Sequence, residues 1–235
     1  MRALDRGHQA IGDLFGIPAI VINPMRDPKA EPRWLAIIAL LAVGGIYTAL
    51  PPSLIIGPRW LLLAIVIVLV VPAVISRRMG HHQLNRVLGY LVSAVITLAL
   101  VISLSLLIKA LPEKTETASA LLLSAAALWL TNILVFALWY WRLDAGGPHQ
   151  RAHRATHTEG SFLFPQMLEY ARPADERNWS PTFIDYLFIA FNTSTAFSPT
   201  DTPVLSRWAK VLTMIQASIS LLIVVLLAAR AVNIF

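Results

Sequence analysis

The stretch of sequence that decides the fold lies at residues 180–203 and reads SPTFIDYLFIAFNTSTAFSPTDTP. Ser180 has the chemistry of a helix N-cap, Pro181 suits the first helical position, and Asp185 lies where a carboxylate favours the helix dipole. Prolines and hydroxyl side chains end this helix after about a dozen residues, which is about 18 Å or roughly half of the hydrocarbon thickness. We therefore expect a helix that enters a membrane partway and turns back.

A chain that turns back at membrane depth must be buried in protein or line a water-filled cavity, because lipid offers no hydrogen-bond partners for free N–H and C=O groups. A half-length helix, a hydroxyl-rich strand and a long apolar helix together predict a pore loop. The alternative is a surface helix and loop that lie in the membrane interface. A complete crossing needs about 20 apolar residues, and Asp185, Asn192 and the Thr and Ser cluster argue against one here.

The whole chain has the composition of a membrane protein. Of its 235 residues, 57% are hydrophobic and 14% are charged, whereas soluble domains have about 45–50% and 25%. This composition excludes an ordinary soluble enzyme. The chain has no cysteine, which excludes disulfides, thiolate metal sites and cysteine nucleophiles. We attribute the net charge of +6 to membrane topology and to contact of the chain with anionic lipid headgroups of the bilayer, not to nucleic acid.

Five apolar runs predict spanning helices, and aromatic residues at their ends suit the headgroup layer. The runs cover residues 34–50, 60–75, 87–108, 118–141 and 208–229. The predicted fold class is all-α integral membrane, with five transmembrane helices plus one re-entrant pore-type helix and loop before the last helix. We divide the chain into an N-terminal cytoplasmic or interfacial segment (1–33), a four-helix transmembrane region (34–141), a polar linker (142–179), and a unit of pore helix, filter-like loop and final helix (180–235).

The orientation follows from the positions of Lys and Arg. With a cytoplasmic N-terminus, fifteen of these residues lie inside and four lie outside, which is the direction of the positive-inside rule. We therefore expect the N-terminus in the cytoplasm and the C-terminus outside. The N-terminal segment is either a short amphipathic surface helix or a loosely ordered tail.

Residues 186–201 resemble the pore region of tetrameric potassium-type channels with two transmembrane helices. In those channels an aromatic-rich pore helix runs into Thr-x-Thr-Thr-Val-Gly-Tyr-Gly-Asp and then into the inner helix, and Thr193, Thr195 and Asp201 occupy matching places without gaps. The chain also resembles, over most of its length, an uncharacterised bacterial family of integral membrane proteins that is classed as a domain of unknown function. That second likeness implies the inner (plasma) membrane of a bacterium and no established activity.

The likeness to channels implies a homo-tetramer around a pore, with a filter formed by Thr193, Thr195, Ala196, Phe197, Ser198, Pro199, Thr200 and Asp201. Ser198 and Thr200 replace the glycines whose backbone conformations aim carbonyl oxygens at the ion, and Pro199 replaces the tyrosine. We therefore expect hydroxyl and carbonyl oxygens to coordinate a monovalent cation, and Asp201 to add a ring of negative charge. Alternatively, the prolines end a turn and Asp201 caps the final helix.

The final helix follows this loop directly, so we expect Gln216 and Ser220 to line a cavity beneath the filter. Hydrogen bonding between helices is the alternative for these residues. The predicted function is passive transport of small cations by a channel with a divergent, non-glycine filter. The alternative is a non-conducting structural or regulatory membrane protein that retains a channel-like hairpin.

Two histidine groups lie at the expected cytoplasmic side. His149, His153 and His157 recur every four residues, which makes them weak candidates for a metal site, while a pH-responsive cluster or a solvated linker are the alternatives. The pair His81 and His82 lies among arginines, for which contact with lipid phosphate is the simplest interpretation.

The first four apolar runs contain no Asp, Glu, Lys or His, although proton-coupled carriers and intramembrane enzymes need such groups at depth. We therefore expect neither an enzyme nor a catalytic residue.

Overall fold

The computed structural model describes residues 31–113, 117–153, 160–168, 179–198 and 201–231. These residues form helices and one isolated bridge between Phe162 and Val204. The helices in chain order are α2 (Trp34–Ala49), η1 (Pro52–Leu54), α3 (Leu61–Arg78), α4 (His82–Glu113), α5 (Ala118–Leu143), η2 (Asp144–Gly146), α6 (Pro148–Ala152), η3 (Pro165–Met167), α7 (Phe183–Thr195) and α8 (Arg207–Ala231). The all-helical prediction is therefore confirmed, while most of the predicted N-terminal segment lies outside the described residues.

Each of the five predicted apolar runs forms a helix, but within the described residues only four of these helices are long and apolar enough to cross a membrane. These four are α3, α4, α5 and α8. Helix α2 has 16 residues, which corresponds to about 24 Å, and it ends before Pro51 and Pro52. The chain then folds back through η1, whose Leu54 is fully buried. The long apolar helices indicate a membrane protein.

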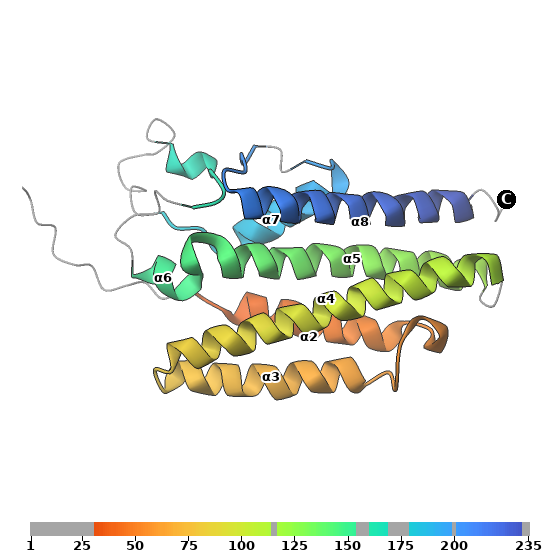
Figure 1. The fold of residues 1–235 in the computed structure, drawn as a ribbon, viewed down its shortest axis with the longest axis horizontal. Helices are drawn as coiled ribbons and strands as arrows, with labels where there is room; N and C mark the ends of the chain where they lie inside the picture. The colour runs from red at the N-terminus through yellow and green to blue at the C-terminus, as the bar shows by residue number, and fades with distance from the viewer. Residues whose placement is uncertain (1–30, 114–116, 154–159, 169–178, 199–200, 232–235) are drawn as a thin grey trace, which may run out of the picture.

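Helix α5 lies at the centre of the bundle (Figure 1). It packs against α2 and α4 on one side and against α7 and α8 on the other. The apolar window of α5 is 61% buried, whereas that of α3 is 17% buried. This difference places the protein core around α5 and leaves α3 as an outer helix whose apolar side chains face the surroundings.

Helices α3 and α5 end, and α4 and α8 begin, at one end of the bundle (Figure 1). Most of the described Lys and Arg residues lie in the sequence at these helix ends. We call this the basic end, and among the described residues its cations are Arg33, Arg77, Arg78, Arg86, Arg142, Arg151, Arg207 and Lys210. Three described basic residues lie toward the opposite end, namely Arg59 before α3, Lys109 near the end of α4 and Arg230 near the end of α8. The asymmetry agrees with the distribution from which the orientation is predicted.

Helix α7 and the loop after it form a hairpin that leaves the basic end and returns to it. Near the start of α7, the Tyr186 hydroxyl donates to Asp144 Oδ2 at 2.7 Å, at the end of α5. Near the end of α7, Ser194 lies beside Asn132, halfway along α5. The chain then returns, because Leu205 N donates to Ser161 O at 2.8 Å, beside Asp144. The described residues on either side of positions 199–200 therefore lead away from the basic end and back to it.

The start of α7 differs from the prediction by two residues. Thr182, not Ser180, occupies the N-cap position, and the helix begins at Phe183. Asp185 Oδ2 accepts hydrogen bonds from Thr182 N at 2.7 Å and from Thr182 Oγ1 at 2.9 Å. The side chain of residue 185 thus closes the cap, because Thr182 has the same capping chemistry as Ser180 and stands three residues before a carboxylate.

Candidate functional site

The inner side of the hairpin carries a buried polar network between α5, α7 and α8. Gln216 is fully buried, and its Nε2 donates to Ala190 O at 2.7 Å and to Ser194 Oγ at 2.9 Å. Gln216 Oε1 accepts from the Tyr140 hydroxyl at 2.5 Å. Every hydrogen-bonding group of this amide head therefore contacts another helix of the same chain.

Ser220 belongs to the same network. Its hydroxyl donates to Ser194 O at 2.6 Å and accepts from Trp129 Nε1 at 3.0 Å. Ser220 is fully buried, as is Gln216. Both side chains thus join helices and do not line a cavity, so the prediction of a lining role is wrong and the inter-helix alternative holds. Helical periodicity places both residues on one face of α8. It does not predict which helices cover this face, and in the structure these are α5 and α7.

The described filter residues divide into one buried residue, Thr193, and an exposed tip. Thr193 is 1% exposed, and its hydroxyl donates to Ile189 O at 2.8 Å within α7. Thr195 is exposed and its hydroxyl donates to Phe191 O at 2.9 Å. Ala196, Phe197 and Ser198 follow at the surface of the chain.

The tip turns sharply after α7. Phe197 has a φ of 55°, a left-handed conformation that is strained for a bulky side chain. Pro199 and Thr200 lie outside the described residues, and Asp201 is exposed. Asp201 does not cap the final helix, because α8 begins six residues later at Arg207.

A second polar cluster lies at the C-terminal end of α5, within the basic end. It was not predicted from the sequence. We call it the arginine lock and define it as Glu31, Asp144, Arg151 and Tyr186. Arg151 is 3% exposed and forms a salt bridge of 3.0 Å with Glu31. Its Nη1 donates to Trp141 O at 2.8 Å and to Asp144 O at 2.9 Å, and its guanidinium lies 5.0 Å from the Tyr186 ring.

The arginine lock holds the ends of α5, α6 and α7 together. A sequence signal was present, since Asp144 and Arg151 flank the Gly146-Gly147-Pro148 turn. That turn brings them together, with Gly146 and Gly147 at φ of 80° and 89°. Their pairing with residue 31, more than a hundred positions away, depends on the fold.

The histidines of the linker do not gather as a three-residue site among the described residues, where no group of three metal-ligating side chains occurs. His149 stacks on His82 of α4 with ring centroids 3.8 Å apart, and His153 lies edge-on to His149 at 4.4 Å. His157 lies outside the described residues. Helix α6 has five residues, so the predicted helical histidine face extends over little more than one turn.

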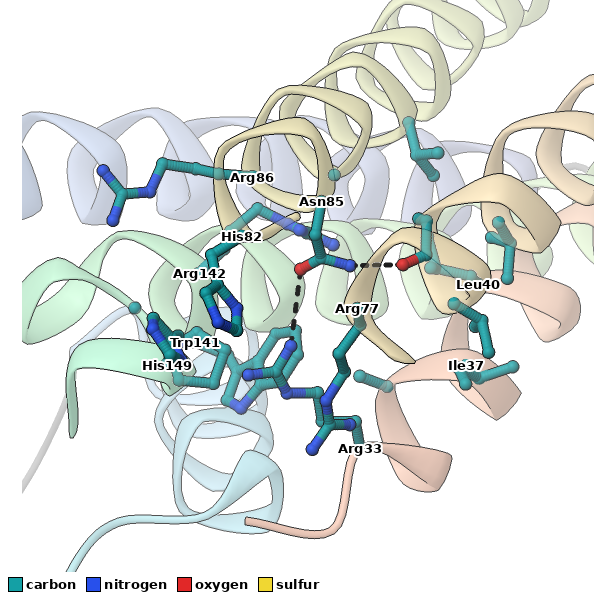
Figure 2. Close-up of a pocket in the computed structure, with 18 of the residues that line it drawn as sticks. Arg33, Ile37, Leu40, Arg77, His82, Asn85, Arg86, Trp141, Arg142 and His149 are labelled. Carbon is teal, nitrogen blue, oxygen red and sulfur yellow. Dashed lines mark hydrogen bonds between the residues drawn. The ribbon is translucent and has the colours of Figure 1, made fainter. Parts of the chain in front are cut away.

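A cavity of about 550 Å³ opens between α2, α3, α4, the end of α5 and α6 at the basic end. We call it the basic cavity (Figure 2). Five arginines line it, and these are Arg33, Arg77, Arg78, Arg86 and Arg142. His82 and His149 contribute their stacked rings. Figure 2 shows Ile37 and Leu40 on the opposite side of the cavity from His82 and His149, so the cavity lining has a basic part and an apolar part.

The arginines of the basic cavity are held by few protein groups. Arg33 Nη1 donates to Asn85 Oδ1 at 3.4 Å, and Asn85 Nδ2 donates to Ala73 O at 2.6 Å. Arg33 Nε and Arg142 Nε are buried and have no hydrogen-bond partner among the described residues. Burial, followed by the nearby Arg77, lowers the pKa of Arg33 to about 10, so the guanidinium stays charged at neutral pH.

No protein family model, curated protein or solved structure matches this chain. The resemblance of residues 186–201 to potassium-type channels therefore stays a prediction.

Proposed function

We propose that α7 and the loop after it line a path for small cations between copies of this chain in a membrane. The supporting observation is that α7 ends at Thr195, halfway along α5, before the chain returns to the basic end. A helix C-terminus carries a partial negative charge of about half an elementary charge. The end of α7 at this depth therefore favours a cation.

The exposed tip supplies the oxygen atoms for such a path. Thr195, Ser198 and Asp201 are exposed in the single chain, whereas the Thr193 hydroxyl bonds inside α7. The proposed lining therefore contains fewer residues than the filter predicted from the sequence. Because no glycine is present in the tip, coordination by hydroxyls and by the Asp201 carboxylate replaces the carbonyl ladder of a potassium filter.

A path of this kind needs several copies of the chain, since one chain contributes one hairpin. We propose a homo-tetramer with the tips at its axis and with the basic end in the cytoplasm of a bacterium, in agreement with the positive-inside rule. The outer face of α7 is apolar and exposed, with Ile184, Phe188 and Phe191 each about half exposed in the single chain. In the proposed assembly this face contacts the neighbouring copy or lipid.

A second candidate function is favoured by the polar network. Ser194, Gln216, Ser220 and Tyr140 bond to one another within one chain. These polar groups of the hairpin therefore find hydrogen-bond partners without a neighbouring copy. This is expected for a non-conducting structural or regulatory protein that uses the hairpin for packing. This candidate implies a monomer or a dimer.

Flux and oligomeric state separate the two candidates. Purified full-length protein in liposomes is tested for K⁺ and Na⁺ flux, and native mass spectrometry gives the number of copies. Conduction predicts a tetramer whose flux falls several-fold in Asp201→Asn, because a ring of negative charge is lost. Lys210→Gln is the control, since it changes one exposed charge on α8 at the basic end, outside the hairpin tip. A monomer or dimer without flux would establish the second candidate.

A further inference from the structure

We infer that the basic cavity binds a phosphate-bearing anion at the basic end of the bundle. The cavity lies on the far side of α5 from the hairpin, between α2, α3 and α4, and shares no residue with the proposed cation path. Its volume of about 550 Å³ falls within the range of about 300–1,000 Å³ that is typical of ligand sites.

The first observation is an excess of positive charge without carboxylates. Five arginines line the cavity, and no Asp or Glu is among its described lining residues. The salt bridge found among the described residues joins Arg151 to Glu31, and none of the five arginines forms one with the described carboxylates. Like charges that converge in a partly buried space repel one another, and a bound anion removes this repulsion.

The second observation is that donors of two arginines remain unused. Arg33 Nε and Arg142 Nε are buried without a hydrogen-bond partner among the described residues. Guanidinium groups bind phosphate oxygens through two parallel N–H···O bonds, which a neutral ligand or a monatomic anion does not match as well. An oxyanion such as phosphate therefore fits the unused donors.

The third observation is a backbone position that makes room for one of these guanidinium groups. A Cβ atom on Gly89 would lie 1.5 Å from Arg142 Nη1. The absence of a side chain at this position of α4 lets the Arg142 guanidinium, which extends from α5, lie directly against the α4 backbone. The position of the cation in the cavity thus depends on a glycine in the neighbouring helix.

The apolar part of the cavity indicates what else the ligand carries. Ile37, Leu40, Val70 and Val92 line the cavity beyond the arginines, along helices that are apolar enough to lie in lipid. A basic pocket between membrane helices at the cytoplasmic side is a known arrangement for lipid headgroups. The phosphate group has two sources, an anionic phospholipid and a soluble phosphate compound, and the experiment below distinguishes them.

The experiment uses full-length protein in neutral detergent and measures its thermal unfolding and its bound lipid by native mass spectrometry. The probes are phosphatidylglycerol, phosphatidylcholine as the uncharged lipid, and inorganic phosphate. We expect phosphatidylglycerol to bind and to raise the unfolding temperature, while phosphatidylcholine does neither. A stabilisation by inorganic phosphate alone assigns the site to a soluble phosphate compound. If neither anion stabilises the protein, the proposal is wrong.

Two variants test the assignment to the cavity. The double substitution Arg33→Gln and Arg142→Gln removes two charge-assisted contacts, so we expect the anion to bind at least about tenfold more weakly. The double substitution Arg207→Gln and Lys210→Gln is the matched control, because it also removes two charges, and both residues are exposed at the same end without lining the cavity. Equal weakening in the control would show general attraction to the basic end and would overturn the site.

A variant that keeps every charge guards against loss of folding in the double variant. Gly89→Ala displaces the Arg142 guanidinium, so we expect the anion to bind several-fold more weakly. Gly45→Ala is its control, because a Cβ at this position of α2 meets no atom within 4 Å. Unchanged anion binding by both Gly89→Ala and the double variant would contradict the proposed site.

Discussion

Gln216 illustrates how one polar side chain organises the interior of the bundle. Its amide contacts Ala190 and Ser194 of α7 and Tyr140 of α5. The sequence indicates that position 216 is polar within an apolar run, but it leaves open whether the side chain faces water or other helices. That choice depends on which elements pack against this face of α8, and the spacing of residues in one helix does not contain this information.

We predict that Gln216→Leu lowers the free energy of unfolding, because the Tyr140 hydroxyl loses its acceptor in a fully buried position. Hydrogen bonds between membrane helices are worth about 0.6 kcal/mol on average and at most about 1.7 kcal/mol. Reversible unfolding in detergent measures the loss. Ser105→Ala is the control, because the Ser105 hydroxyl is exposed and donates to Val101 O within its own helix α4. A loss no larger than that of the control would show that the network is dispensable.

His149 makes the stability of the basic end depend on pH. Burial lowers its pKa, and the neighbouring His82, His153, Arg33 and Arg86 lower it further. The folded protein therefore favours neutral His149, so the unfolded chain takes up a proton first as the pH falls through the ordinary value of 6.5. We predict a lower unfolding temperature at acid pH, and a smaller change in His149→Gln. An equal pH dependence in both proteins would contradict this assignment.

At the scale of elements, the sequence indicates the hairpin but not its surroundings. Prolines and hydroxyl residues after Phe191 predict a short helix and its end, and α7 indeed has 13 residues. The arginine lock is different, since it joins residues from four separate segments. A local turn brings Asp144 and Arg151 together, but only the fold brings Glu31 and Tyr186 into contact with them.

We predict that Arg151→Met destabilises the protein by about 3–5 kcal/mol. The substitution leaves the Glu31 carboxylate without its buried cation and the Asp144 carbonyl oxygen without its guanidinium donor. The double variant Glu31→Gln with Arg151→Met should recover part of this loss, since it no longer buries an unpaired charge. Unfolding of the two variants beside wild type gives the comparison. No recovery in the double variant would mean that the salt bridge is not the main interaction of Arg151.

At the scale of the whole molecule, α5 separates two regions. The hairpin and α8 lie on one side of it, and the basic cavity with α2, α3 and α4 lies on the other. Composition and hydropathy predict the long helices and the basic end, because length and charge are local properties. They do not predict that α5 is the central helix, nor that five arginines converge, because both follow from packing between distant segments.

The most direct test of the central claim uses the fact that the chain has no cysteine. Thr195→Cys places one thiol at the exposed end of α7, and Thr48→Cys places one in α2, away from the hairpin. Cation flux into liposomes is measured before and after a charged, water-soluble thiol reagent is added. We expect the reagent to abolish flux in Thr195→Cys and to leave flux in Thr48→Cys unchanged. Flux that is absent in wild type, or that persists after complete labelling of residue 195, would contradict the proposed cation path.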